Sequence, residues 1–374
     1  MAYRLIFPLL AGVLLLVPGL AMSARPAPVD RPDLIAPMDV ARFPSLESAI
    51  RIKGPVAFCG EPVPIDSPAI RERLEIELLL MLWDRAQVIL WLKRTGRYFP
   101  FIEASLARAG MPDDLKYVAV IESALKPHAG SRRGARGVWQ FIESTGRKHG
   151  LVIDRYIDER RNAELATGAA LAYLKELHDE FGAWTLACAA YNMGEVGLAK
   201  RIEAQETDDY YHLDLPNETE RYVLRAIAAK IILSDPARFG FRLEEGDYYR
   251  PEDVDRIRLK TTHMAPVLVV AKAAGTYYKT IKDLNPQLLD DVIPPGEHVL
   301  FLPKGAADGF AERYQPLIVQ HRKATVGKTY TVQRGDTLTA IARKTGTPYR
   351  KLLKLNNLNN RSVIRPGQKL VIMR

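Results

Sequence analysis

One short apolar segment that carries a single carboxylate constrains the fold more than any other part of the chain. Pro112 precedes this segment and Pro127 follows it, so the pattern predicts a helix over residues 115–126. Apolar residues at helical spacing lead to the carboxylate, in the order Leu115, Val118, Ala119 and Glu122. A stripe of this kind faces a protein core, so the sequence predicts a domain of packed helices with Glu122 in line with its core.

The position of Glu122 has two interpretations. Burial disfavours an ionised carboxylate and raises its pKa, which suits a general acid that works near neutral pH. The alternative is an exposed residue at the helix end that forms an ion pair with Lys126, four residues later. The helix by itself does not choose between them.

Length and composition indicate a folded protein of two or three domains. The chain has 374 residues, of which 47% are hydrophobic and 26% are charged, so it can bury a sizeable core. The formal net charge of +9 favours an acidic partner. Nucleic acid, anionic lipid and an acidic cell-wall polymer all satisfy that charge, which does not choose among them.

The N-terminus is typical of an exported protein. Arg4 precedes an apolar run over residues 5–20, and small residues follow at 21–24, so residues 1–24 are predicted to be a signal peptide. An uncleaved signal anchor is the alternative. The two cysteines, Cys59 and Cys188, could pair in an oxidising compartment, although the Ala-rich surroundings of Cys188 favour a small buried side chain.

Residues 25–67 are rich in proline and are predicted to be an extended lead-in. Residues 68–240 have the pattern of an all-helical domain. Its expected helices cover residues 69–109 with a second helix from 100, then 115–126, 162–182, 184–193 and 218–233, and an apolar segment covers 138–149.

The last third of the chain contains an internal repeat. At a constant offset of 71 residues, the two copies match without gaps at Ala271 and Ala342, Gly275 and Gly346, Tyr278 and Tyr349, Asn285 and Asn356, and Gly296 and Gly367. Each copy has the pattern strand, helix, helix, strand, and the copies cover residues 252–304 and 328–374. The segment 305–327 between them is predicted to be a linker with a short helix over 306–314.

The copies differ at their first turn. The second copy has Gly335, Asp336 and Thr337 there, whereas the first has Met264, Ala265 and Pro266 at the same offset. We infer one intact module and one degenerate module.

Few residues indicate chemistry. The histidines show no metal-ligand spacing, no glycine-rich loop could hold a phosphate, and no serine or cysteine has the setting of a nucleophile, so neither a metal nor a cofactor is expected. Several polar residues could converge on Glu122, namely Ser123, Ser131, Gln140, Tyr191 and Asn192. Each of them by itself is more often a hydrogen-bonded packing residue.

Together these residues resemble a known enzyme family. The motifs are Glu122-Ser123, the run from Ser131 to Gln140 with its two glycines and Trp139, and the later Ala-Ala-Tyr191-Asn192-Met-Gly. They are similar to the lysozyme-like lytic transglycosylases, and most of all to the membrane-bound transglycosylase D subgroup. The run from Pro216 to Val223 is similar to a later signature of that family, and residues 330–338 resemble a LysM peptidoglycan-binding module.

This resemblance implies an α+β multidomain protein, with an all-α lysozyme-like catalytic domain followed by small βααβ LysM-like modules. It implies cleavage of the β-1,4 bond between N-acetylmuramic acid and N-acetylglucosamine, with formation of 1,6-anhydromuramic ends. Glu122 would be the single acid and base. Tyr191 would steady charge at the reacting centre, and the other substrate-binding residues would be Ser123, Ser131, Gln140 and Asn192, with Glu218 and Tyr222 in a secondary role.

For the second module, the resemblance implies an N-acetylglucosamine groove formed by the turn at Gly335, Asp336 and Thr337 and by the loop after Asn356. A purely structural turn would also favour glycine and aspartate. The first module is expected to bind glycan weakly or not at all.

The expected partner is therefore peptidoglycan, in the periplasm or cell envelope, with membrane association through an uncleaved signal or a basic surface as a further expectation. Two other functions stay open: a goose-type hydrolase that uses water, and a non-catalytic scaffold that binds the wall. Nucleic acid has the weakest support, since it rests on charge alone.

Overall fold

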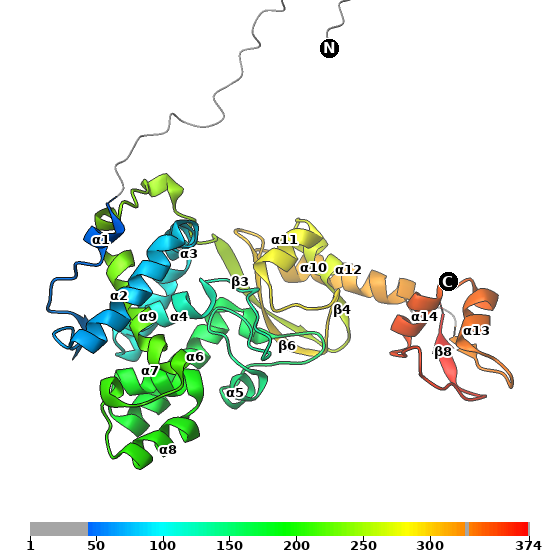
Figure 1. The fold of residues 1–374 in the computed structure, drawn as a ribbon. Coiled ribbons are helices and arrows are strands. Elements are labelled where there is room, and N and C mark those ends of the chain that lie inside the picture. The colour runs from blue at the N-terminus through cyan, green and yellow to red at the C-terminus, as the bar shows by residue number, and fades with distance from the viewer. Residues whose placement is uncertain (1–43, 326–328, 373–374) are drawn as a thin grey trace, which may run out of the picture. The chain divides into compact units, whose positions relative to one another are not determined.

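The computed structural model describes residues 44–325 and 329–372 (Figure 1). The predicted signal peptide 1–24 and the lead-in up to residue 43 lie outside the described residues. The rest of the lead-in contains the short helix α1 (Leu46–Ala49) and a small hairpin of β1 (Ala57–Phe58) and β2 (Glu61–Pro62). Phe58 in this hairpin is fully buried, so the end of the lead-in belongs to the core of the helical domain.

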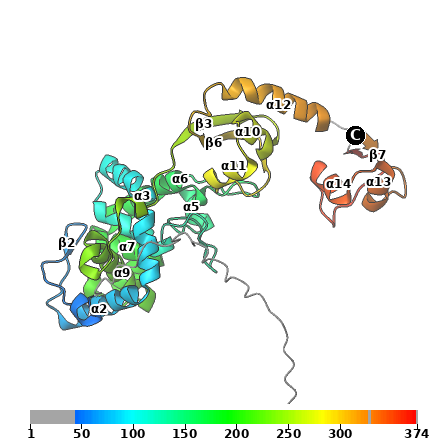
Figure 2. The ribbon, with the colours of Figure 1, turned by 90° about the horizontal axis from the view of Figure 1, so that it is seen from above.

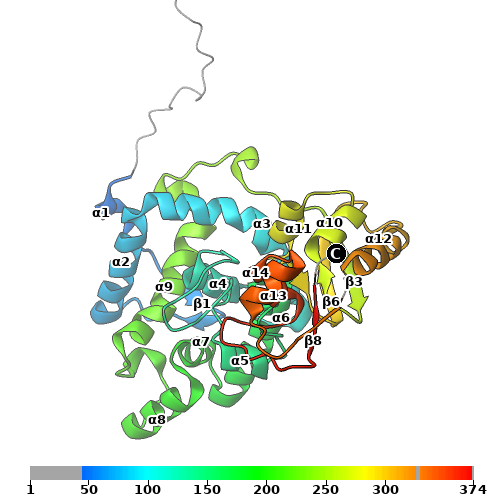
Figure 3. The same cartoon turned by 90° about the vertical axis from the view of Figure 1, so that its right-hand side faces the viewer.

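Helices build the first domain. They are α2 (Pro68–Trp83), α3 (Arg85–Ala109), α4 (Lys116–Ser123), α5 (Glu143–Lys148), α6 (Ala163–Phe181), α7 (Trp184–Met193), α8 (Glu195–Gln205) and α9 (Asn217–Ser234). Figure 3 shows α2 and α9 side by side, and α9 also packs against α4 and α7. The short helix α4 is almost entirely buried, because its neighbours α3 and α9 both pack on it.

Local signals place several of these helices where the sequence predicts them. The Asn162 side chain accepts hydrogen bonds from the backbone N–H groups of Glu164 and Leu165 at the start of α6. Gly182 ends α6 in the left-handed conformation, with φ of 75°. The helix expected over residues 184–193 is α7, with the same bounds.

Other boundaries differ from the expectation. The break between α2 and α3 lies at Asp84, and α3 continues through Pro100, so no separate helix begins there. Helix α4 ends at Ser123, before Pro127, because Ala124 and Leu125 both have positive φ. The apolar segment 138–149 begins as a loop and forms the short α5 in its second half, and α8 was not expected.

The two repeats have the expected strand, helix, helix, strand order. The first comprises β3 (Val254–Thr261), α10 (Val267–Ala273), α11 (Tyr278–Leu284) and β6 (Gly296–Pro303). The second comprises β7 (Thr329–Thr331), α13 (Leu338–Thr345), α14 (Tyr349–Leu355) and β8 (Lys369–Val371). In each repeat the two outer strands pair antiparallel. Helices α11 and α14 have the same bounds once the offset of 71 residues is applied.

The segment between the repeats differs from the expected linker. Most of it is the helix α12 (Phe310–Thr325), which packs against α10 (Figure 2). Phe310, Tyr314 and Ile318 of this helix are buried in the core of the first repeat. The first repeat therefore extends well beyond residue 304, whereas the second has a separate core.

Two further findings concern export and redox state. Within residues 44–325 and 329–372, no helix has the length and apolar character needed to cross a membrane. Cys59 and Cys188 are buried free thiols, and burial raises the pKa of both.

Candidate active site

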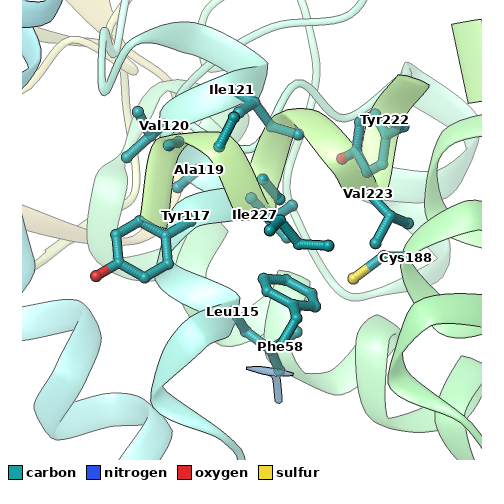
Figure 4. Close-up of a cluster of buried hydrophobic side chains, with 14 of the residues drawn as sticks. Phe58, Leu115, Tyr117, Ala119, Val120, Ile121, Cys188, Tyr222, Val223 and Ile227 are labelled. Carbon is teal, nitrogen blue, oxygen red and sulfur yellow. The ribbon is translucent and has the colours of Figure 1, made fainter. Parts of the chain in front are cut away.

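Glu122 lies in the last turn of α4, where its carboxylate meets α9. The Tyr222 hydroxyl donates a hydrogen bond to Glu122 Oε1 at 2.5 Å. Tyr222 is buried and Glu122 is partly buried, so protein encloses most of the Glu122 side chain. Figure 4 shows the apolar side chains between these helices, among them Ile121 of α4 and Val223 of α9.

These surroundings raise the pKa of Glu122 to about 7. Burial is the largest cause, because it disfavours the charged carboxylate. The hydrogen bond from Tyr222 and the charge of Arg225 both act against this shift, and the negative charge of Glu218 adds to it. The structure thus favours the first interpretation of Glu122, a buried acid, over a surface ion pair with Lys126.

Arg225 is a site residue that the sequence analysis missed. It lies on α9, and its guanidinium donates a hydrogen bond to the Ile121 carbonyl at 3.1 Å. Glu218, Tyr222 and Arg225 follow each other at i, i+4 and i+7, so they share one face of α9. That spacing could have identified Arg225, since two of the three residues were already candidates.

Three of the predicted substrate-binding residues hold the loop over residues 134–141. The Ser123 hydroxyl donates to the Val138 carbonyl at 2.7 Å, and the Tyr191 hydroxyl donates to the Trp139 carbonyl at 2.7 Å. The side-chain amide of Gln140 donates to the Gly137 carbonyl, also at 2.7 Å. These polar groups therefore position the loop beside Glu122, and their contacts to substrate stay a prediction.

Tyr191 also interacts electrostatically with Glu122. Burial and then the charge of Glu122 raise the pKa of Tyr191 well above its usual value, so its hydroxyl keeps its proton. The Tyr191 ring packs with Phe141 and Tyr173, at centroid distances of 6.0 and 5.4 Å. Tyr222 of α9 therefore bonds to the carboxylate directly, whereas Tyr191 of α7 interacts with it electrostatically.

The remaining candidates lie at the margin of the site. Asn192 accepts a hydrogen bond from the Thr219 hydroxyl at 2.9 Å, which ties α7 to α9. Ser131 lies in an exposed turn, where its hydroxyl accepts a bond from the Ala135 N–H at 3.1 Å. Glu218 is exposed in the first turn of α9.

Other carboxylates near the site in sequence have cationic partners. Asp113 binds Lys116 at 2.5 Å, Asp114 binds Lys230 at 2.7 Å, and the exposed Glu143 binds Arg147 at 2.9 Å. These three carboxylates therefore form ion pairs. Within the described ranges 44–325 and 329–372, no group of three or more His, Cys, Asp or Glu residues could hold a metal ion.

Comparison with known proteins gives the family. The family model of the transglycosylase SLT domain matches residues 99–213, which contain Glu122. Membrane-bound lytic murein transglycosylase D of Escherichia coli strain K12 is 32% identical over 331 residues, which cover 84% of this chain and 72% of the relative. The chain belongs to the membrane-bound lytic murein transglycosylase D family.

The other comparisons agree with a transglycosylase that carries wall-binding modules. The LysM-like domain of lytic transglycosylase MltD matches residues 258–317, and the LysM domain matches residues 330–372. An N-acetylmuramoyl-L-alanine amidase, sle1 of Staphylococcus aureus strain USA300, is 33% identical over 164 residues, or 43% of this chain and 42% of the relative. This transglycosylase therefore has an SLT domain followed by two modules of the LysM type.

In the LysM module of the transglycosylase, the first turn uses its side chains internally. Asp336 accepts hydrogen bonds from the Gln333 N–H and the Tyr330 hydroxyl, both at 2.8 Å. Thr337 caps α13 by accepting the Ala340 N–H at 3.1 Å, and Gly335 has φ of 90°. Gly335 and Thr337 are exposed in this turn, and glycan binding there stays a prediction.

Asn356 has a role that the sequence analysis did not foresee. Its side chain donates to the carbonyls of Leu352 and Val371, at 2.9 and 2.8 Å, and accepts the Val371 N–H at 2.6 Å. In the first module, Asn285 makes the same three kinds of contact with Ile281 and Phe301, each at 2.8 Å. The matched asparagines therefore join the second helix to the last strand, whether or not the module retains the Gly-Asp-Thr turn.

Proposed function

We propose that this transglycosylase cleaves the β-1,4 bond between N-acetylmuramic acid and N-acetylglucosamine and forms a 1,6-anhydromuramic end, with Glu122 as its single acid and base. The observation that carries the proposal is the enclosed carboxylate of Glu122, whose pKa is raised to about 7. At neutral pH such a group has comparable populations of acid and carboxylate. A residue that must act first as an acid and then as a base needs both forms to be accessible.

In the first step, protonated Glu122 gives its proton to the glycosidic oxygen as the bond to the muramic carbon breaks. The sugar then carries developing positive charge, and Glu122 has become a carboxylate. In the second step, the C6 hydroxyl oxygen of the same sugar bonds to that carbon, and its proton passes to Glu122. Glu122 is protonated again, and no water is consumed.

A glycosidase that uses water normally needs a second carboxylate as base or nucleophile. The C6 hydroxyl is already held beside the reacting carbon, so its high effective concentration replaces that group. Glu218, which interacts electrostatically with Glu122, is exposed at the start of α9, and the proposed reaction does not require it.

Tyr222 and Arg225 stabilise Glu122 after it has given up its proton. Both lower the pKa of Glu122 against the larger effect of burial. The balance between burial and these two groups keeps the carboxylate basic enough to accept the proton of the C6 hydroxyl. It also keeps protonated Glu122 acidic enough to give up its proton near neutral pH. The other predicted site residues would contact or position the sugars around Glu122, namely Tyr191, Ser123, Gln140, Asn192 and Ser131.

Glu218 favours one alternative, a goose-type hydrolase in which a second carboxylate activates water. The mass of the products separates the two reactions, because a transglycosylase product is lighter by one water than the hydrolytic product. We expect muropeptides with anhydro ends from the wild-type chain and none from Glu122→Gln. Hydrolytic masses from the wild type would contradict the proposal, and an inert wild type would favour a non-catalytic wall-binding scaffold.

We further propose that the protein works outside the cytoplasm, with residues 1–24 as its export signal and with peptidoglycan as its partner. The modules of the LysM type support this location, since they would hold the enzyme at the wall. The membrane-bound name of the E. coli relative supports an uncleaved signal as an anchor. Fractionation of cells and N-terminal sequencing of the mature chain test both points, and a chain found in the cytoplasm would contradict them.

A further inference from the structure

The loop before α6 contacts the first repeat through its backbone and through one buried side chain. Ile157 is 2% exposed and belongs to the core of that repeat. The Asp158 N–H donates to the Gln287 carbonyl at 2.9 Å, and the Leu289 N–H donates to the Tyr156 carbonyl at 2.8 Å. The loop is therefore paired with the repeat as one strand pairs with another.

The same loop contacts the active-site loop through a buried ion pair. The Asp158 carboxylate accepts two hydrogen bonds from the Arg160 guanidinium, both at 2.8 Å. Arg160 also donates to the Gly134 and Phe141 carbonyls, at 3.0 and 3.1 Å. These carbonyls lie at the two ends of the loop over 134–141, so one guanidinium closes that loop.

The active-site loop has little freedom where Arg160 meets it. Gly137 has φ of 85°, and a Cβ atom built there would lie 1.7 Å from the Arg160 carbonyl oxygen, so glycine is required. Farther along the same loop, the Val138 and Trp139 carbonyls accept the bonds from Ser123 and Tyr191. Ser123 directly follows Glu122, so the contacts form a continuous series from the repeat to the catalytic carboxylate.

The segment of the first repeat that contacts the loop before α6 corresponds to an exposed segment of the second repeat. Residues 287–289 correspond, at the offset of 71, to residues 358–360 of the LysM module. That loop follows Asn356 and would form one side of its glycan groove, and Asn359 and Asn360 are exposed there. In the first repeat, the matching segment is covered by residues 156–158.

We propose that Asp158 and Arg160 are positioning residues of the transglycosylase, and that the first repeat serves to hold them in place rather than to bind glycan. The repeat fixes the loop before α6, that loop fixes Arg160, and Arg160 fixes the loop that closes the site beside Glu122. The inference rests on the proposed function, because its consequence is measured in the same reaction.

The test compares paired variants of the full chain on short soluble glycan strands, where wall binding plays no part. Arg160→Lys keeps the charge but loses the guanidinium fork, and Arg242→Lys, at an exposed arginine outside these contacts, is the matched control. We expect kcat to fall about tenfold or more in Arg160→Lys, because small displacements of catalytic groups are costly, while KM changes by less than about twofold. Arg242→Lys should stay within about twofold of the wild type by the same argument.

The pH profile separates positioning from a general loss of stability. A loosened loop admits water to Glu122, which reduces the effect of burial and lowers the pKa of that carboxyl. The alkaline limb of kcat/KM should therefore move to lower pH in Arg160→Lys and not in Arg242→Lys. A loss of activity with an unchanged pH profile would overturn the inference, as would equal activity of the two variants.

A second pair tests the repeat itself and does not depend on whether Arg160→Lys folds. Leu289→Pro removes the N–H that bonds to Tyr156, and Leu289→Ala keeps it, while the Leu289 side chain is largely exposed. We expect kcat to fall about threefold or more in the proline variant relative to the alanine variant, with the same shift of the alkaline limb. Equal kcat and equal profiles in the two would overturn the role of the repeat, whereas an inactive wild type would instead contradict the proposed function.

Discussion

Glu122 and Asp336 each accept a hydrogen bond from a tyrosine, yet their pKa values move in opposite directions. In the catalytic domain, Tyr222 donates to Glu122 at 2.5 Å, and the pKa of Glu122 is raised to about 7. In the LysM module, Tyr330 donates to Asp336 at 2.8 Å, and the pKa of Asp336 is lowered.

This difference shows that burial, and not the hydrogen bond from tyrosine, decides whether the pKa of each carboxyl is raised or lowered. In both pairs the hydrogen bond from tyrosine lowers the pKa. Glu122 is enclosed between α4 and α9, so desolvation outweighs that bond. Asp336 lies in an exposed turn and also accepts the Gln333 N–H, so it stays a carboxylate and holds the turn.

The largest expected effect comes from Glu122→Gln, which keeps the shape of the acid but cannot transfer a proton. We expect kcat on soluble glycan strands to fall by a factor on the order of 10³ or more, since one residue supplies both the acid and the base. Release of muropeptides measures it. Activity within tenfold of the wild type would break the comparison, because Glu122 would then be no more than a structural carboxylate.

The same variant has an opposite effect on stability. The folded pKa of Glu122, about 7, lies above its ordinary value of 4.5, so the native state binds more protons between these pH values. Stability of the wild type therefore falls as the pH rises through this window. Glu122→Gln should melt at higher temperature than the wild type at pH 8 and at the same temperature near pH 4.

Removing the LysM module separates the two regions. A chain that ends at residue 325 keeps the cores of the catalytic domain and the first repeat, because the second repeat has a core of its own. We expect activity on intact sacculi to fall by about tenfold to a hundredfold through lost avidity, with little change on soluble strands. Equal losses on both substrates would contradict a role for the module in wall binding.

Tyr222→Phe tests the hydrogen bond within the catalytic pair. Because that bond lowers the pKa of Glu122, its loss should raise the pKa above 7 and move the alkaline limb of kcat/KM to higher pH. We expect kcat to fall by about tenfold, since the carboxylate formed during the reaction loses a charge-assisted hydrogen bond. An alkaline limb that moves to lower pH would contradict the claim that the Tyr222 hydrogen bond lowers the pKa of Glu122.

The smallest effect is expected at Asp336. Asp336→Asn keeps a side-chain oxygen for the Gln333 N–H and the Tyr330 hydroxyl, so wall binding by the full chain should fall by about threefold or less. Asp336→Ala removes both bonds and should weaken binding further. In the wild type, binding should not change between pH 5 and 8, because the pKa of Asp336 lies below 3.8. A titration in that range which the asparagine variant abolishes would contradict this.

Local patterns were sufficient to predict much of the fold. Neighbouring residues are sufficient to predict the cap at Asn162, the end of α6 at Gly182 and the bounds of α7. The constant offset of 71 residues predicts that α11 and α14 correspond. The family match likewise confirms the transglycosylase domain and the LysM modules that the motifs indicated.

The remaining features depend on contacts between distant residues. The segment 305–327 looks like a linker by composition, but Phe310 and Tyr314 place its helix on the core of the first repeat. The pKa of Glu122 also depends on α9, a hundred residues away, because Tyr222 bonds to the carboxylate and the charge of Arg225 acts on it. Asn356 resembles a ligand-binding residue in sequence, although it joins a helix to a strand.

The most direct test is a titration of the side-chain carboxyl carbons by NMR in the wild-type chain, with Glu122→Gln and Asp336→Asn used to assign the two signals. The account predicts a midpoint of about 7 for Glu122 and a midpoint below 3.8 for Asp336. A Glu122 midpoint near 4.5 would contradict the central claim, because a fully ionised carboxylate at neutral pH could not act as the general acid.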